Sequence, residues 1–254
     1  MKSNIDLRFL LDIPSEKFEK FHNLTKIKWW PKSSHSLGLP LIKRKKIYFK
    51  GYSRLNEILL PLPVLPKKNF QDIMESRKSS RSFSKSTLLS LKTLGSIIFY
   101  SAGIKKGSND FGKRFYPSAG ALYPLEIYLI STSTKLPNGV YHYYLKNHSL
   151  EQLFLFDRFD YQKYFNQGWM EKSSCLLVIT AVFKRTTKTY GDRGYRHIII
   201  ETGHLGQNIY LCCAAFGIDC CAVGGYIDNN LNEFLDVDGI NEGVVYVLAL
   251  GMAD

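Results

Sequence analysis

The sequence predicts one domain of helices and strands packed around a single central sheet, of the α+β or α/β class. The segment Cys175–Phe183 is continuously apolar and rich in β-favouring residues, which is typical of a buried central strand. The segment Tyr195–Phe216 has the pattern of a long helix and ends at Gly217, where a left-handed cap is expected. The chain has 254 residues, 45% of them hydrophobic and 22% charged, which suffices for one domain with a sizeable core.

Residues 1–66 are expected to form a basic N-terminal extension ahead of a main domain of residues 67–254. The extension carries the short amphipathic stretch Phe18–Leu24, followed by Trp29-Trp30-Pro31. The alternating prolines of Leu60–Pro66 cannot be helical, so this stretch should run extended as a connector.

The net charge is placed unevenly along the chain. Residues 1–86 hold 19 Lys and Arg against 7 Asp and Glu, whereas residues 87–254 hold 15 of each, so the first third carries the whole formal charge of +12. Such a field attracts an acidic peptide, a phosphate or nucleic acid, although a solvated basic face explains it equally well. Nucleic acid is not expected, because no recognisable reader fold surrounds the Lys43–Lys46 run.

The main domain is expected to open with two helices. The first spans residues 69–78 and has an apolar face formed by Phe70, Ile73 and Met74. The second spans residues 87–100, with Ser86 as its N-cap and Gly103 as its stop.

Strands then alternate with the remaining helices. Strands are expected at Leu125–Ser131, Val140–Tyr144, Leu153–Phe156, Cys175–Phe183, Ala222–Val223 and Val244–Leu250. Asp228 is expected to cap a helix that runs through Leu235. This order mixes both kinds of element around one sheet.

The composition argues against several classes of protein. No apolar run reaches the roughly 18 to 20 residues of a membrane-spanning helix, and the N-terminus lacks the build of a signal peptide, so a cytoplasmic protein with no membrane span is expected. The five cysteines form no CxxC pair and lie in apolar segments, which predicts buried free thiols. No metal site is expected, because adjacent helical cysteines rarely chelate together and no HExxH is present.

Two motifs point to a phosphate and to a flat ring. Arg77–Phe83 places three cations and several hydroxyls at the end of a helix, as a phosphate monoester requires, although a basic helix end that balances the helix dipole has the same pattern. In Arg114–Glu126, Pro117 and Pro124 fix the backbone around small residues, which permits the close approach of a flat ring. A tight loop that leads into a strand is the alternative.

Two further motifs lie later in the chain. Tyr190–Arg196 precedes the helical stretch Glu201–Asn208. Small or polar residues share one face of that helix and favour close helix–helix contact, either across a dimer or within one subunit: Gly203, Gln207, Tyr210 and Ala214. The glycine amides of Gly224–Gly225, after a short strand, can reach a ligand with no side chain in the way.

Taken together, the order of these motifs resembles that of the nitroreductase-like flavoproteins. Within that family, Arg114–Glu126, Tyr190–Arg196 and the early stretch Phe21–Lys26 look like the SagB-type dehydrogenases. The resemblance runs from about residue 20 to residue 251.

The resemblance implies an α+β, nitroreductase-like fold with a central mixed or antiparallel sheet flanked by helices. It also implies a homodimer with FMN at the subunit interface. Carried over, the FMN-binding residues are Arg77, Lys78, Ser79 and Arg81 for the phosphate and the polar ring edge; Pro117, Ser118 and Gly120 for the ring; Gly224 and Gly225 for the N5 edge; and, less directly, Gln207.

The implied reaction is oxidation of thiazoline or oxazoline rings to thiazole or oxazole in a ribosomally made peptide. The resemblance makes Tyr190 the first candidate for the general base, with Lys188 lowering its pKa or replacing it, unless Tyr190 only packs near the flavin. The precursor peptide would come from a cyclodehydratase, in a complex, and dioxygen would reoxidise the flavin.

Two departures from the family pattern keep other functions open. Thr189 stands where a lysine usually precedes the tyrosine, and no basic residue follows the last strand. One alternative is a general nitro- or quinone reductase that uses NAD(P)H, against which the Tyr190–Arg196 stretch argues. The other is a flavin-free scaffold subunit of a peptide-modifying complex.

Overall fold

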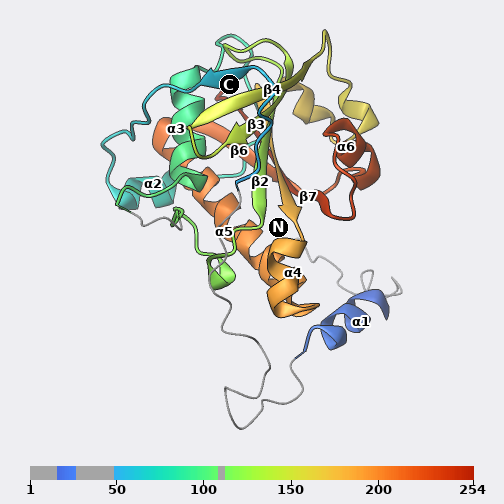
Figure 1. The fold of residues 1–254 in the computed structure, drawn as a ribbon. Coiled ribbons are helices and arrows are strands. Elements are labelled where there is room, and N and C mark those ends of the chain that lie inside the picture. Colours follow the sequence, from blue (N-terminus) through green and yellow to red (C-terminus); the bar gives the residue numbers. More distant parts are fainter. Residues whose placement is uncertain (1–15, 27–48, 108–111) are drawn as a thin grey trace, which may run out of the picture.

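The computed structural model describes residues 16–26, 49–107 and 112–254 (Figure 1). The Trp29–Pro31 and Lys43–Lys46 stretches lie outside these ranges. The helices are α1 (Glu16–Leu24), α2 (Phe70–Ser76), α3 (Leu91–Ala102), α4 (Lys184–Tyr190), α5 (Arg193–Phe216) and α6 (Asp228–Phe234). The strands are β1 (Glu57–Leu59), β2 (Leu125–Ser131), β3 (Gly139–Tyr144), β4 (Ser149–Leu155), β5 (Cys175–Val182), β6 (Ile218–Val223) and β7 (Glu242–Met252).

One seven-stranded sheet organises the described chain, in the order β1-β4-β3-β2-β5-β7-β6. Every neighbouring pair of strands in it is antiparallel. The predicted α+β class, with an antiparallel sheet flanked by helices, is therefore confirmed. The apolar run predicted as a central strand is β5, which pairs with β2 on one side and β7 on the other.

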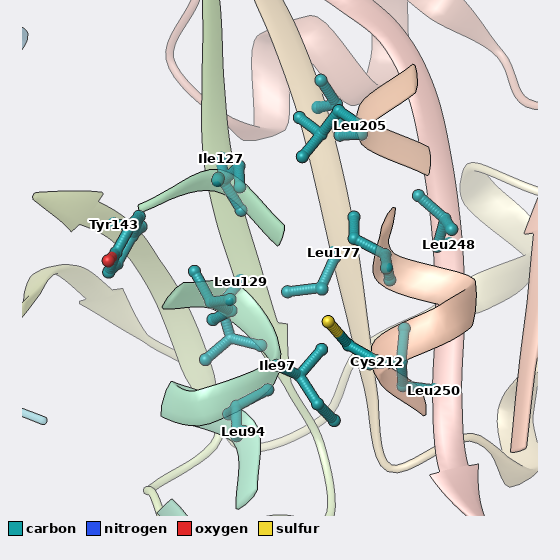
Figure 2. Packing of buried hydrophobic residues seen from close by; sticks show 14 of the residues in the cluster. Leu94, Ile97, Ile127, Leu129, Tyr143, Leu177, Leu205, Cys212, Leu248 and Leu250 are labelled. Carbon is teal, nitrogen blue, oxygen red and sulfur yellow. The ribbon is translucent and has the colours of Figure 1, made fainter. Parts of the chain in front are cut away.

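Each face of the sheet is covered by its own hydrophobic cluster. On one face, α3 and α5 pack through fully buried side chains such as Ile97 and Leu205 onto Leu177 of β5 (Figure 2). The opposite face is covered by an aromatic cluster that includes Phe159, Tyr164 and Phe165. Each large apolar side chain buried in this way contributes about 1.5–3 kcal/mol, so α5 is held firmly along its inner face.

Several element boundaries differ from the prediction. The second helix begins at Leu91, because Ser90 and not Ser86 caps it, accepting a hydrogen bond of 3.1 Å from the Thr93 amide. The chain just before it is still extended, since Leu89 forms a bridge to Thr134.

Several caps and bounds of the later elements also differ from the prediction. Asp228 lies inside the first turn of α6 and makes no cap, since Ile227 holds the capping position. Among the strands, β4 starts earlier than expected, at Ser149, and Ala222–Val223 is only the end of β6. Strand β7 extends beyond the expected Val244–Leu250 at both ends. The long helix, in contrast, ends as predicted, with Gly217 in the left-handed conformation at φ 68°.

Two helices also differ from the prediction, one in the burial of its face and the other in its existence. α2 has no fully buried residue, and Phe70 and Met74 of its predicted apolar face are 70% and 46% exposed, while Ile73 is partly buried. α4 (Lys184–Tyr190) was not expected as a helix, since three of its seven residues are threonines, which have modest helix propensity.

Parts of the predicted N-terminal extension pack against the main domain. Strand β1 extends the sheet beside β4, and the Val64 amide donates to Ser96 Oγ of α3 at 3.1 Å. Helix α1 includes the amphipathic stretch Phe18–Leu24. Arg193, at the start of α5, donates a hydrogen bond of 2.9 Å to the carbonyl of Thr25, which directly follows the last residue of α1. The division at residue 66 stays a prediction.

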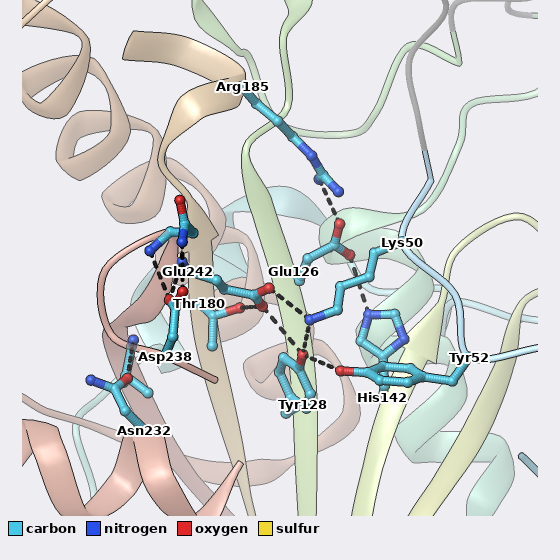
Figure 3. A network of polar contacts seen from close by, with 12 residues as sticks. Lys50, Tyr52, Glu126, Tyr128, His142, Thr180, Arg185, Asn232, Asp238 and Glu242 are labelled. Carbon is cyan, nitrogen blue, oxygen red and sulfur yellow. Dashed lines mark hydrogen bonds and ion pairs between the residues drawn. The ribbon is translucent and has the colours of Figure 1, made fainter. Parts of the chain in front are cut away.

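A buried polar network ties the same N-terminal stretch to the sheet (Figure 3). Lys50 Nζ donates to the Tyr128 hydroxyl at 2.5 Å and to Glu242 Oε2 at 2.6 Å. Glu242 also accepts from Thr180 Oγ1 at 2.7 Å. One lysine of the extension thus joins β2, β5 and β7.

The second half of this network contains a fully buried histidine. His142 lies between Glu151, at 2.8 Å, and Glu126, at 3.3 Å, and Arg185 lies 2.5 Å from Glu126. Burial would raise the pKa of Glu126, but the hydrogen bond from His142 and the charge of Arg185 outweigh it and lower this pKa to about 2. Burial opposes the charged form of His142, yet its two glutamate partners raise its pKa above the ordinary value.

Two remaining expectations concern cysteines and membranes. All five cysteines are buried free thiols, as predicted. Over the described ranges, no helix combines the length and the hydropathy that crossing a bilayer requires.

Candidate functional site

The Arg77–Arg81 segment lies along the edge strand β6 and the second half of α5. The Ser80 amide donates to the carbonyl of Cys220 at 3.0 Å, and the Ser79 and Tyr210 hydroxyls are 3.0 Å apart. The Arg77 guanidinium lies over the Tyr210 ring, 5.6 Å from its centre. Three segments that are distant in sequence therefore meet around one tyrosine.

The same tyrosine connects this segment to the predicted glycine pair. The Tyr210 hydroxyl accepts a hydrogen bond of 2.6 Å from the Ala222 amide, two residues before Gly224. Both Gly224 and Gly225 are exposed, and a Cβ built on Gly224 would meet nothing within 4 Å. We call this set the β6 group, which consists of Arg77, Lys78, Ser79, Arg81, Tyr210, Gly224 and Gly225.

The cations of the β6 group differ in their availability. Lys78 Nζ forms an ion pair with Asp219 at 3.3 Å. Among the described residues, Arg77 and Arg81 form no ion pair. Two guanidinium groups beside a serine hydroxyl and the open backbone at Gly224 suit a phosphate monoester, whereas Gln167 lies close to Gly225. The FMN phosphate therefore fits the residues present here.

The predicted ring-binding residues lie elsewhere, on a tight turn before β2. Gly120 adopts φ 62°, and the non-glycine residues Ala121 and Tyr123 also have positive φ, at 53° and 45°. The turn is braced by the Tyr123 amide, which donates to Ser118 Oγ at 2.9 Å. Strained backbone of this kind costs of order 1–3 kcal/mol per residue and is concentrated at functional sites.

The candidate base, Tyr190, touches this turn. A Cβ on Gly120 would lie 2.7 Å from the Tyr190 hydroxyl, so a side chain at this position would push that hydroxyl away from the turn. The Tyr190 ring also packs edge-on against His197, with ring centres 5.0 Å apart. We call this second set the turn group, which consists of Pro117, Ser118, Gly120, Tyr190 and His197.

The structure does not bring Lys188 to Tyr190. Both residues are on α4, where residues two positions apart do not face each other, and Lys188 is exposed. The supporting role of Lys188 stays a prediction.

A buried acid beneath the turn was not predicted as a site residue. Glu201 on α5 is only 3% exposed, and neither carboxylate oxygen is within hydrogen-bonding geometry of a described residue. Burial raises the pKa of Glu201 to about 7, although nearby Ser118, Arg114 and the Ala119 amide draw it down. Glu201 opens the Glu201–Asn208 motif, and an acid within an apolar helical face was the pattern that could have revealed it.

The β6 group and the turn group lie at different ends of α5. His197 and Tyr210 are 13 residues apart on this helix, which corresponds to roughly 20 Å. Gln207, the weakest of the predicted flavin contacts, is exposed between them, as is Gly203. Within one subunit, the predicted phosphate-binding and ring-binding residues are therefore not brought together.

Comparison with known proteins shows which family has this fold. The Nitroreductase family model matches residues 74–252. The protein MJ1384 of Methanocaldococcus jannaschii, described as a nitroreductase, is 32% identical over 182 residues, which cover 70% of this chain and 89% of that protein. The microcin B17-processing protein McbC of Escherichia coli is 31% identical over 134 residues, about half of each chain.

Solved structures agree with this placement. A nitroreductase structure from Anabaena variabilis has a TM-score of 0.67 and 28% identity, and the match covers 91% of this chain but only 45% of that one. The E. coli microcin synthetase McbBCD complex with truncated pro-MccB17 bound has a TM-score of 0.59 over the full length of both chains, and at 21% identity this likeness concerns the fold alone. Because the family model spans most of the described domain, the chain belongs to the nitroreductase family.

Proposed function

We propose that this protein is an FMN-dependent dehydrogenase of the SagB type, which oxidises thiazoline or oxazoline rings in a ribosomally made peptide. The observation that carries the proposal is the contact between the Tyr190 hydroxyl and Gly120 on the strained turn. It places a proton-accepting group directly against the residues expected to line the flavin. The similarity to McbC, a microcin B17-processing protein, supports a peptide substrate.

The cofactor contacts are divided between the two groups. Arg77, Ser79 and Arg81 would hold the FMN phosphate, while Lys78 is already paired with Asp219. Pro117, Ser118 and Gly120 would line the ring, with Gly224 and Gly225 at its redox-active edge and Gln207 beside it. When bound, FMN would take up the hydride that leaves one ring carbon of the azoline. Tyr190 would remove the proton from the neighbouring carbon.

A homodimer would unite the two groups. Between them, α5 exposes an apolar stripe that includes Ile199 and Ile200, at 44% and 51% exposure, beside the exposed Gly203 and Gln207. A stripe of this kind marks an interface. A twofold axis near the middle of α5 would bring the turn group of one copy beside the β6 group of the other.

The remaining parts of the proposal concern partners and location. The likeness to McbC and to the fold of the McbBCD complex supports a place in a peptide-modifying complex. A cyclodehydratase would supply the azoline peptide there, and dioxygen would reoxidise the flavin. We propose that this occurs in the cytoplasm.

The purified protein is expected to be yellow and dimeric, with one FMN per chain, because each twofold pair contains two complete sites. Mass spectrometry of the released chromophore and light scattering check these two points. The same preparation should convert a thiazoline-containing peptide to the thiazole, with a loss of two hydrogen atoms per ring. A colourless protein that gains no absorbance on addition of FMN contradicts the enzyme and favours the scaffold.

The similarity to MJ1384, described as a nitroreductase, favours one alternative activity, a general nitro- or quinone reductase. Rapid oxidation of NAD(P)H in the presence of a nitroaromatic, together with no oxidation of azoline peptides, would support this alternative over ours.

Replacing Arg77 by alanine is expected to weaken FMN binding about tenfold to a hundredfold, since a charge-assisted phosphate contact contributes about 1.5–3 kcal/mol. Titration of the flavin-free protein with FMN measures this change. Arg54→Ala is the matched control, because Arg54 is an exposed arginine just before β1, at the opposite edge of the sheet from β6. Equal losses in both variants would remove Arg77 from the phosphate site.

A further inference from the structure

The acid beneath the turn is an unusual feature of the site. Glu201 is buried on the inner side of α5, directly below the segment that carries Ser118 and Ala119. Buried carboxyl groups are normally hydrogen-bonded or paired. Both oxygens of Glu201 and the Nε of buried Arg114 have no hydrogen-bond partner among the described residues. Such a cluster of unsatisfied groups requires an explanation.

Among the described residues, Arg114 is the positive charge that lowers the pKa of Glu201. It is itself buried, and its Nη1 donates to the Tyr116 hydroxyl at 3.0 Å and to the Leu125 carbonyl at 3.3 Å. The guanidinium also stacks on the Tyr123 ring at 4.7 Å. One end of the turn is thus fixed by Arg114.

The ionisation state of Glu201 determines which hydrogen bonds its carboxyl group can form with the turn. As a carboxylate, it offers acceptor oxygens to both the Ser118 hydroxyl and the Ala119 amide, the nearby groups that lower its pKa. When protonated, it keeps one such acceptor and gains a donor that neither group needs. Ser118 Oγ already accepts from the Tyr123 amide, so its proton is free to point at Glu201.

We propose that Glu201 is the positioning residue of the flavin-lining turn, and that its carboxylate, balanced by Arg114, orients Ser118 and Ala119 from beneath. The assignment of this turn to the flavin rests on the proposed function. The support that Glu201 gives to the turn is independent of the proposed function. An experiment can therefore contradict the flavin assignment and leave the role of Glu201 intact, or the reverse.

Other titrating groups surround this acid and must be separated from it. Tyr116 faces Glu201 from the turn segment, and burial raises the pKa of its hydroxyl far above neutrality. Glu126 of β2 acts on the cluster through Arg114, and its pKa lies at about 2. His197 lies one helical turn before Glu201, and burial, together with Arg193 and Arg196, lowers its pKa. Among these groups, Glu201 is the one placed to titrate near pH 7.

The first test measures hydrogen exchange of the 114–124 segment in the full-length protein, compared with its Glu201→Gln variant at pH 5.5 and pH 8. Comparison at equal pH cancels the intrinsic dependence of exchange on pH. We expect the variant to exchange about tenfold faster in this segment at pH 8, and equally fast at pH 5.5. The surface variant Glu233→Gln on α6 is the matched control and should show no difference. Equal protection of wild type and Glu201→Gln at pH 8 would overturn the proposal.

A second variant keeps the test decisive if Glu201→Gln does not fold. Ser118→Ala removes the hydroxyl that the carboxylate orients and leaves the buried charges in place. Its segment 114–124 should lose more protection at pH 8 than at pH 5.5, because the loss of the hydrogen bond from the Tyr123 amide is common to both pH values. Loss of the same size at both pH values would show a merely structural serine and would count against the role of Glu201.

FMN binding provides the link to the proposed function. Wild-type affinity for FMN should rise about tenfold between pH 6 and pH 8 beyond any rise seen in Glu201→Gln, because both proteins share the titration of the FMN phosphate. Parallel profiles in the two proteins contradict the positioning role. If no FMN binds to either protein, the proposed function fails, and the exchange measurement alone decides the role of Glu201.

Discussion

Replacing Tyr190 by phenylalanine is expected to lower the rate of azoline oxidation by a factor on the order of 10²–10⁴, which is typical of losing a general base. The change removes only the hydroxyl that lies against Gly120 and keeps the ring that packs on His197. FMN affinity and the melting temperature should therefore remain at the parent values. Single-turnover kinetics with a thiazoline peptide measure the rate, and flavin titration measures the affinity.

Tyr195→Phe is the matched control for this variant. Tyr195 is 40% exposed on α5 and packs on Phe21 and Phe183, away from the turn group. It should oxidise substrate at nearly the parent rate. Lys188→Ala should have a smaller effect than Tyr190→Phe, because Lys188 does not face Tyr190 within the subunit. A parent rate in Tyr190→Phe would exclude Tyr190 as the base and leave the family membership intact.

Replacing Glu126 by glutamine is expected to destabilise the protein by about 3–5 kcal/mol at pH 7, as breaking a buried ion pair does. The change removes the carboxylate that His142 and Arg185 share, so that His142 keeps only Glu151 and Arg185 keeps no ion pair among the described residues. Urea unfolding at pH 7 measures the loss of free energy. Glu233→Gln, an exposed carboxylate on α6, is the control and should change the stability by less than about 0.5 kcal/mol.

The dependence of this effect on pH has a definite sign. The folded-state pKa of Glu126 is lowered to about 2, below an ordinary value of 4.5. Its contribution to stability is therefore complete above pH 4.5 and is lost as the pH falls towards 2. The difference between wild type and Glu126→Gln should shrink over that window. A difference that stays constant down to pH 3 would mean that shape, and not charge, makes Glu126 important.

Much of the fold could be predicted from the sequence because local patterns dominate it. Leu125–Ser131 forms a strand with the predicted bounds, and Gly217 ends the long helix as its left-handed conformation requires. The misplaced cap shows the limit of such patterns. Ser86 and Ser90 are equally good caps in isolation, and the bridge from Leu89 to Thr134, a tertiary contact, selects Ser90.

The candidate site could be predicted only in part, for a physical reason. The motifs predict which residues line a ligand, but they do not report which end of a helix each residue lies beside. Only the structure shows that Arg77 lies beside Tyr210, in the second half of α5, whereas Gly120 lies beside Tyr190, near the start of that helix. A buried acid such as Glu201 leaves little trace in composition, since its importance comes from burial beside Arg114.

Strand order in the sheet also has a consequence for how the chain is completed during synthesis. β7 is translated after β5 and β6, yet it lies between them in the sheet. Until residues 242–252 leave the ribosome, β5 and β6 each present an unpaired edge that can associate with other chains. The glycine pair that follows β6 therefore takes its final place only when almost the whole chain has emerged. Nascent chains stalled before residue 242 should aggregate and should not acquire the cofactor.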